Sequence, residues 1–334
     1  MRTAVRRPLP PSRALLAAGA LLTLTATLAA GCGGGATSSG GSGGSGESKV
    51  VVAETAGMPT AFLQYGIKKG FFEGLTVEVQ SGQGGAASIP AVVSGDAQFA
   101  GSNAVSVLLA GGKGLPIKIV APGSFATDDL ERDYSSVMVR DDGSIDSLKD
   151  LEGKTVAVNT LDNINDLTLM KLLDDAGADS SKVNLIEVPF PEMAAALRTG
   201  KVDATNPIEP FVSQSLAEGA RIIGSPFSGT RRNLQVGCFV TTEQFLQQNP
   251  ETVERFRAGL SRTAKDIAEH PDAFREFLPG AADIEPELAE EMVLPAWQTS
   301  IDRESLQLLA DLMVKYKIAQ GRPPVAELLE GTKQ

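Results

Sequence analysis

The sequence of 334 residues has little of the material that several kinds of site require. It contains one histidine and two cysteines, which leaves little for a zinc site, a disulfide framework or acid–base catalysis by histidine. Basic residues are also in the minority, with 30 Lys and Arg against 41 Asp and Glu. We find no local basic patch, so the chain is a poor candidate for binding nucleic acid or anionic lipid head groups.

The net charge of −11 is unevenly distributed along the chain. Residues 1–31 hold four arginines and no acidic residue, so the remaining chain has 26 basic residues against the same 41 acidic ones, a net charge of −15. The hydrophobic share of 42% is ordinary for a globular protein. The length fits one large domain or two ordinary ones.

The N-terminal segment has the pattern of an export signal. Its basic start precedes an apolar run over 14–30, which is shorter than the roughly 20 residues of a membrane-spanning helix and ends in small residues. The ending LAAGC at 28–32 resembles the lipobox of bacterial lipoproteins, a resemblance that implies cleavage after residue 31 and a lipid on Cys32. A plain secretory signal with an incidental cysteine is the alternative. Residues 32–48 are mostly Gly and Ser and are expected to form a flexible tether.

Cys238 is then the one thiol left in the mature chain. It lies in an apolar, strand-like run at 235–240, which predicts a buried structural cysteine. No disulfide is therefore possible within the mature monomer.

After the tether, strand-like and helix-like segments alternate. One series extends from residue 49 to residue 121, and a second begins near residue 145. From residue 243 to residue 330 the pattern is almost purely helical. Repeated β-α units predict mostly parallel sheets with helices on both faces. The predicted strands are 49–54, 75–81, 97–100, 117–121, 134–140, 155–159, 183–188, 202–205, 221–223 and 235–241, the last of which would return the chain to the first lobe.

Polar residues gather where the predicted strands end. Ligands of open α/β sheets bind beyond the carboxyl ends of the strands, and helix N-termini there can hold an anion without Lys or Arg. Each residue also has an ordinary explanation, because Ser, Asn and Asp cap helices and Met58 and Phe125 suit a packing role. Convergence of the joints of both lobes on one cleft favours a site. The predicted ligand contacts are Met58, Ser102, Asn103 and Phe125 from the first lobe, and Thr160, Asn163, Asn165, Asn206 and Glu209 from the second.

Glu209 carries the sharpest indication of ligand chemistry. If its carboxylate faces the cleft, it disfavours a simple dianion and suits an amine or hydroxyl donor; the alternative is that it faces outward. Arg231 and Arg232 either meet an acidic ligand at the lobe boundary or lie in a solvated loop.

Several motifs in order along the chain resemble a known family. These are GFFE at 70–73, SGQGGAA at 81–87, VSGDAQFA at 93–100, the segment 148–158, AALRTGKVDA at 195–204 and NPIEPF at 206–211. Together they resemble the periplasmic substrate-binding proteins of nitrate, taurine and sulfonate transporters, a group that also includes binders of thiamine-pyrimidine precursors. The resemblance implies the α/β, type II periplasmic-binding-protein fold, in which two lobes close on a ligand. The lobes would be residues 49–138 with 240–330, and residues 139–239.

The resemblance also implies a function. We expect an extracytoplasmic solute-binding protein, held by its lipid at the periplasmic side or cell surface, that delivers a small organic ligand to an ABC permease and its ATPase. A sulfonate- or carboxylate-like anion is among the candidate ligands. We expect a monomer with no cofactor, metal or catalytic residue.

Two other classes remain open at this stage. Thiamine-pyrimidine synthases share the fold and consume an active-site histidine, but His270 lies at a predicted helix end, where a solvent-facing or capping role is expected. No Ser-His-Asp, Cys-His or HExxH arrangement is available. A surface sensor or adhesion lipoprotein with a protein partner is the other alternative.

Overall fold

The computed structural model describes residues 48–82, 84–282 and 284–331. Cys32, the apolar run before it and the tether after it lie outside these residues. No helix in the described part of the chain combines the length and the apolar character needed to span a bilayer.

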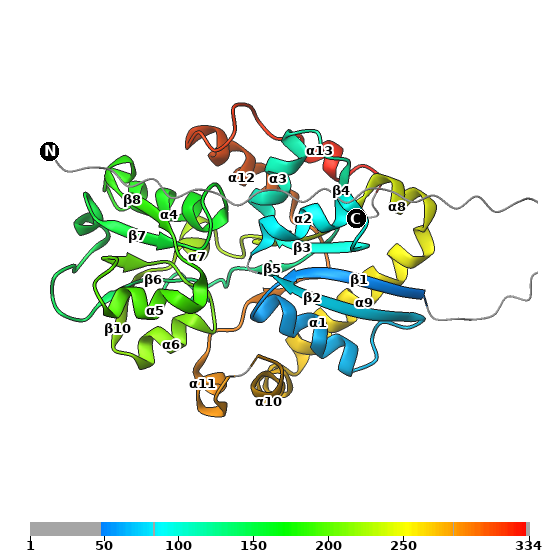
Figure 1. Ribbon diagram of the computed structural model, residues 1–334, viewed down its shortest axis with the longest axis horizontal. Helices are drawn as coiled ribbons and strands as arrows, with labels where there is room; N and C mark the ends of the chain where they lie inside the picture. Colours follow the sequence, from blue (N-terminus) through cyan, green and yellow to red (C-terminus); the bar gives the residue numbers. More distant parts are fainter. Residues whose placement is uncertain (1–47, 83, 283, 332–334) are drawn as a thin grey trace, which may run out of the picture. The chain divides into compact units, whose positions relative to one another are not determined.

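The first sheet has five strands in the order β2-β1-β3-β11-β4 (Figure 1). Strand β1 is parallel to β2 and β3, whereas β11 is antiparallel to its neighbours β3 and β4. The strands are β1 (Ser48–Thr55), β2 (Leu75–Gly82), β3 (Phe99–Asn103), β4 (Ile117–Pro122) and β11 (Gly237–Thr242).

The second sheet has five strands in the order β10-β6-β9-β7-β8. Here β7 is parallel to β8 and β9, and β6 is antiparallel to β9 and β10. The strands are β6 (Val137–Arg140), β7 (Thr155–Val158), β8 (Asn184–Glu187), β9 (Ala204–Thr205) and β10 (Ala220–Gly224). The expected α/β architecture with two sheets is thereby confirmed.

The two sheets have the same plan. Read from the opposite end, the second sheet is β8-β7-β9-β6-β10, so its antiparallel strand holds the same fourth place as β11 in the first sheet. These two strands are also the ones that begin after the chain passes from one sheet to the other. Strand β6 follows the first passage and β11 follows the second.

Helices flank both sheets (Figure 1). Those of the first series are α1 (Met58–Lys68), α2 (Gly85–Ser94) and α3 (Ala104–Gly112). Those of the second are α4 (Ile164–Asp175), α5 (Phe190–Arg198), α6 (Phe211–Ala217) and α7 (Pro226–Thr230), with the short 3₁₀ turns Leu148–Leu151 and Ser180–Lys182.

The C-terminal region is mainly helical and packs on the first series. Helix α9 places Val253, Phe256, Leu260 and Ile267 on one buried face, a spacing that an amphipathic helix produces. The helices are α8 (Glu243–Gln248), α9 (Pro250–Glu269), α10 (Pro271–Ala282), α11 (Pro286–Glu291), α12 (Arg303–Lys315) and α13 (Val325–Leu328).

One stretch corrects the expectation of an almost purely helical C-terminal region. Between α11 and α12 the chain contains β12 (Ala296–Trp297), which pairs antiparallel with β5 (Ser124–Phe125). Pro295 precedes β12 and explains the departure, because proline has no N–H to donate and disrupts a helix interior. The stretch delivers Trp297 to the site described next.

Candidate ligand-binding site

A cavity lies at the ends of the strands, with walls from both series of elements. It measures about 70 Å³, several times the space that one water molecule occupies by the same measure. Strands β1 and β3 reach it with their carboxyl ends, and the antiparallel β11 reaches it with its beginning. The wall comprises Glu54, Thr55, Pro59, Phe62, Gly85, Ser102, Asn103, Gly123, Ser124, Tyr134, Asn159, Ile164, Asn165, Phe190, Ile208, Phe227, Val236, Gly237, Cys238, Phe239 and Trp297.

Aromatic side chains dominate this wall. Phe62 of α1 stacks on Trp297 of β12, with ring centroids 5.1 Å apart and an angle of 16° between the planes. Tyr134 and Phe227 lie against each other at 5.3 Å and 58°. Phe190 and Phe239 complete the aromatic set. Such walls suit a planar or apolar ligand body, and their faces attract cations.

Polar groups enter the wall where helices begin. Asn103 caps α3 by accepting a hydrogen bond from the Ser106 amide at 2.9 Å, and Ser102 donates to the Gly85 carbonyl at 2.7 Å. Asn165 is in the first turn of α4. Gly85 opens α2, whose N-terminus has no side-chain cap. These groups offer the ligand both hydrogen-bond donors and hydrogen-bond acceptors.

Glu54 is the acidic residue of the wall. Its side chain is 3% exposed, and its Oε1 accepts a hydrogen bond of 2.7 Å from the Thr55 amide. The carboxyl lies against Gly101 of β3, where a Cβ atom would be 1.6 Å from Oε2. Burial raises the pKa of the Glu54 carboxyl from 4.5 to about 8.

Two other titratable groups line the cavity, and both stay protonated at neutral pH. Burial holds the pKa of the Tyr134 hydroxyl well above its ordinary value, and this hydroxyl lies 3.1 Å from the Ser124 hydroxyl. Burial likewise raises the pKa of the Cys238 thiol to about 12. Cys238 is buried, as expected for a structural cysteine, although it also touches the cavity.

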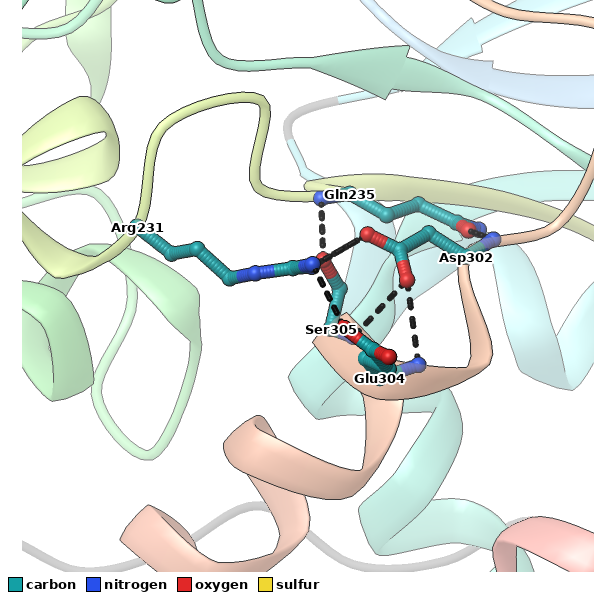
Figure 2. A network of polar contacts seen from close by, with 5 residues as sticks. All are labelled: Arg231, Gln235, Asp302, Glu304 and Ser305. Carbon is teal, nitrogen blue, oxygen red and sulfur yellow. Dashed lines mark hydrogen bonds and ion pairs between the residues drawn. The ribbon is translucent and has the colours of Figure 1, made fainter.

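Basic side chains are absent from the described lining of the cavity. Arg231, a candidate contact, instead forms a network with the start of α12 (Figure 2). Its guanidinium pairs with Asp302, donates to the Ser305 hydroxyl at 2.6 Å and reaches Glu304 at 3.0 Å. The Gln235 amide donates to the same hydroxyl at 3.0 Å. This network ties the segment that leads into β11 to α12.

Three of the nine predicted contacts line the cavity: Ser102, Asn103 and Asn165. Met58 and Phe125 are not in its wall; both are buried, with 1% and 0% of their surfaces exposed. Met58 begins α1 in the hydrophobic core, and Phe125 belongs to the short β5–β12 ribbon.

Three others, Thr160, Asn163 and Asn206, lie behind the wall and outside its lining. Asn163 caps α4 by accepting from the Asn165 amide at 2.7 Å, and it donates to the Thr160 carbonyl at 2.6 Å. Asn206 donates to the Asn165 carbonyl at 3.0 Å and accepts from the Ser135 hydroxyl at 3.0 Å. These contacts hold Asn165, which does line the cavity.

Glu209 neither lines the cavity nor faces outward. It is 1% exposed, and its carboxylate accepts hydrogen bonds from the amide and hydroxyl of Ser213 at 3.0 and 2.8 Å and from the Val293 amide at 3.1 Å. Burial raises its pKa despite these donors and the nearby charge of Arg275.

Sequence reasoning missed Glu54 and all six aromatic residues of the wall. Glu54 immediately precedes the polar joint that begins at Thr55, and an acid directly after the apolar run at 50–53 was the available signal. Trp297 gave no such signal, because it comes from a distant segment. His270 caps the C-terminus of α9, with its Nδ1 3.3 Å from the Asp266 carbonyl oxygen. Within the described residues, no group of three or more His, Cys, Asp and Glu side chains is placed to hold a metal ion.

Solved structures share this architecture. The alkanesulfonate-binding protein SsuA from Xanthomonas axonopodis pv. citri, bound to MOPS, superposes with a TM-score of 0.72 at 15% identity, over 85% of this chain and 98% of that one. The desulfurization enzyme DSZB superposes with a TM-score of 0.61 at 14% identity, over 85% and 96%. The fold is therefore that of periplasmic binding proteins, and an enzyme also uses it.

The family follows from the sequence. Residues 60–274 match the model of the NMT1/THI5 like family, so this chain belongs to that family. This confirms, at the level of the family, the resemblance to binding proteins of the taurine and pyrimidine-precursor type.

Curated relatives are binding proteins. The chain is 26% identical over 61% of its length to the riboflavin-binding protein RibY of Chloroflexus aurantiacus, and 22% identical over 60% to the taurine-binding periplasmic protein of Escherichia coli. It is 31% identical over 43% to the formylaminopyrimidine-binding protein of Halalkalibacterium halodurans. The matches span 58%, 60% and 42% of these relatives' own lengths.

Proposed function

We propose that this protein is the substrate-binding component of an ABC importer, which captures a small organic solute in the cavity and delivers it to a membrane permease. The observation that carries the proposal is the cavity itself, walled by both series of elements at the ends of their strands. Binding there removes the solute from water and replaces its hydration with aromatic surface and fixed polar groups.

The chemistry of the wall supports a solute with a planar or apolar body. The described lining offers six aromatic side chains and no Lys, Arg or His. A sulfonate or carboxylate would lie near Glu54 with only backbone dipoles and neutral side chains to hold it. Relatives named for riboflavin and formylaminopyrimidine support an aromatic solute more directly than the relative named for taurine.

The proposal assigns parts to the rest of the chain. Residues 49–138 with 240–330 and residues 139–239 act as two lobes that close on the solute. Ser102, Asn103 and Asn165 contact it, and Thr160, Asn163, Asn206 and Glu209 act through the backbone they hold, with Met58 and Phe125 packing behind. The lipid on Cys32 keeps the protein at the outer face of the membrane beside the permease, as a monomer with no cofactor.

A thermal-shift screen tests the proposal. The panel contains aromatic cations, neutral aromatics such as pyrimidines, aromatic carboxylates, taurine and alkanesulfonates. We expect at least one aromatic member to raise the melting temperature and to be recovered chemically unchanged by mass spectrometry after incubation. Chemical conversion of the bound compound would replace the transport function with an enzymatic one. Lack of any response, together with capture of a protein partner, would favour a sensor or adhesion protein instead.

Labelling with a fatty-acid analogue tests the anchor separately. We expect the wild-type chain to incorporate the label in a bacterial host and the Cys32→Ala variant to lose it. Equal labelling of both chains would contradict lipidation at Cys32 without touching the solute-binding proposal.

A further inference from the structure

Glu54 has fewer partners than a buried carboxyl ordinarily needs. Its Oε1 accepts one hydrogen bond from the Thr55 amide at 2.7 Å. Its Oε2 accepts none from any residue that the structure describes and lies against Gly101, whose missing side chain leaves room for the carboxyl. A carboxyl that is 3% exposed and has a single donor is costly unless something else binds it. Because Glu54 lines the cavity, a bound solute can supply that partner.

No neighbouring element supplies a compensating cation. Helix α2 and strand β3 contain no titratable residue, and β11 contributes only the protonated Cys238 thiol. Across the cavity, Tyr134 is also protonated.

The charged residues of the other adjoining elements are engaged elsewhere. On β2, Glu78 is exposed and pairs with Lys49 of β1 at 2.7 Å. On α1, the Tyr65 hydroxyl donates to Asp266 at 2.7 Å, and Lys68 is exposed and lies over the Phe277 ring. An ionised Glu54 therefore has no counter-charge among the described residues around it.

The walls around the carboxyl suit the same kind of partner. Aromatic faces carry partial negative charge and attract cations, and Phe62, Phe239 and Trp297 stand in the wall with Glu54. One carboxyl, six aromatic side chains and no base form a surface that favours positive charge and opposes negative charge. The preference for positive charge comes from the side chains of the wall. It does not depend on the backbone N–H groups at helix N-termini, which can still donate hydrogen bonds to a ligand oxygen.

We propose that Glu54 is the charge-selecting residue of the cavity, and that it binds a positively charged nitrogen of an organic cation with a compact, planar body. This proposal rests on the proposed function and narrows its substrate class. In the free protein the Glu54 carboxyl holds a proton at neutral pH, because burial raises its pKa to about 8. Binding of a cation ionises the carboxyl, so one proton passes from Glu54 to solvent as the cation enters.

Three probes of matched shape and different charge test this selection. Benzamidine is a planar cation across the working pH range, benzamide is its neutral counterpart and benzoate its anionic one. Isothermal titration of the full chain from pH 6 to pH 9, in two buffers of different protonation enthalpy, gives each affinity and the number of protons released.

The expected result is preference for benzamidine over benzamide by about tenfold or more, with benzoate weaker still. Linkage to a pKa of about 8 makes the benzamidine affinity rise about 50-fold from pH 6 to pH 8 and then level off. The same linkage releases about 0.9 proton per benzamidine at pH 7.

Substitution of Glu54 by glutamine removes the charge but keeps the size of the side chain, so it tests whether the charge of Glu54 selects the solute. We expect Glu54→Gln to weaken benzamidine by about tenfold or more, to abolish its pH dependence and to leave benzamide within about threefold of wild type. Glu78→Gln is the matched control, the same change on the neighbouring strand at a side chain that is 50% exposed. It should leave all three affinities as in wild type.

Each other outcome overturns the proposal. Benzamide or benzoate binding as tightly as benzamidine would do so, as would unchanged binding by Glu54→Gln, or no benzamidine binding at about 10 mM, where even a millimolar site is mostly filled. If Glu54→Gln does not fold, the proton count on the wild-type chain decides. If benzamidine is not preferred but another solute of the thermal-shift panel binds, only the assignment of Glu54 is contradicted and the proposed function stands. If no solute binds, both proposals are contradicted.

Discussion

Glu54, near the end of β1 in the first sheet, and Glu209, shortly after β9 in the second, are both almost completely buried. Glu209 accepts three hydrogen bonds, two from Ser213 and one from the Val293 amide, and lies outside the cavity wall. Glu54 accepts one and lies within that wall. The same side chain is satisfied by the protein in one region and left for a solute in the other.

The difference teaches which buried acid to examine for function. Donors around Glu209 join the start of α6 to the segment that follows α11, so its carboxylate fastens distant parts of the chain. A buried carboxylate with such partners contributes to stability, and its removal strands the donors. A carboxyl without them costs stability, which is tolerable where ligand binding requires it.

Gly101→Ala tests the position of Glu54 and has the largest expected effect on stability and binding. The new Cβ would lie 1.6 Å from Oε2 and 2.2 Å from the carboxyl carbon of Glu54, so the side chain must leave its place. We expect a loss of about 1–3 kcal/mol in the free energy of unfolding, measured in urea, and loss of benzamidine binding.

Gly112→Ala is the control for that change. A Cβ at the end of α3 would meet only Pro323 at 4.0 Å, so stability should stay within about 0.5 kcal/mol of wild type. Wild-type stability and binding in Gly101→Ala would show that Glu54 is not held against β3.

Glu209→Ala tests the other side of the comparison. Removal of the carboxylate leaves the Ser213 and Val293 amides without their acceptor, which should cost about 1–3 kcal/mol in the free energy of unfolding. The preference of the folded variant for benzamidine over benzoate should be that of wild type. A stable variant with altered charge preference would instead make Glu209 the selecting acid.

The pH dependence of stability sharpens the comparison without a ligand. The pKa of Glu54 is about 8 when folded, above its ordinary value of 4.5, so its proton favours the folded state. This contribution is fully present below about pH 4.5 and is lost as the pH rises through about 8. Between pH 6.5 and 7.5, the wild-type chain should lose about 1 kcal/mol relative to Glu54→Gln in urea titrations.

Other buried acids do not obscure this difference. Asp133 and Asp166, with pKa values raised to about 6, shift stability in the same direction but are common to both chains. Parallel stability curves for wild type and Glu54→Gln would mean that Glu54 titrates normally.

Arg231→Lys should have the smallest effect. The guanidinium binds Asp302, Ser305 and Glu304 together, a forked geometry that lysine cannot reproduce. Because the Arg231 side chain is one-third exposed, the expected loss is about 0.5–1 kcal/mol by thermal denaturation, with charge preference unchanged. Arg232→Lys, at an exposed neighbour, is the control. A changed preference among the three probes in Arg231→Lys would show that the charge of residue 231 influences solute binding.

Much of the fold could be predicted because its signals are local. Apolar runs such as 50–53 and the helical spacing of α9 record burial directly in the sequence. Ser102 and Asn165 were found for a related reason, since the carboxyl ends of parallel strands meet at one edge whatever the solute.

The rest depends on which way a side chain points and on what lies opposite. Met58 and Phe62 are one turn apart on α1, yet Phe62 lines the cavity and Met58 packs in the core. Trp297 reaches the wall from a short strand that pairs with β5, a contact that no local pattern encodes. Both Glu54 and Glu209 are buried acids near the end of a strand, and one donor that satisfies Glu209 comes from distant residue 293.

The place of β11 in the first sheet has a consequence for the order of folding. Its register pairs Cys238 with Ser102, 136 positions earlier in the chain, and it separates β3 from β4. Closing so long a loop is entropically expensive and slow. All strands of the second sheet precede β11 in the sequence, so the first sheet cannot be completed until the chain has passed through the second. We expect the pairing of β11 with β3 and β4 to be a late step in folding, which completes both the first sheet and the wall of the cavity.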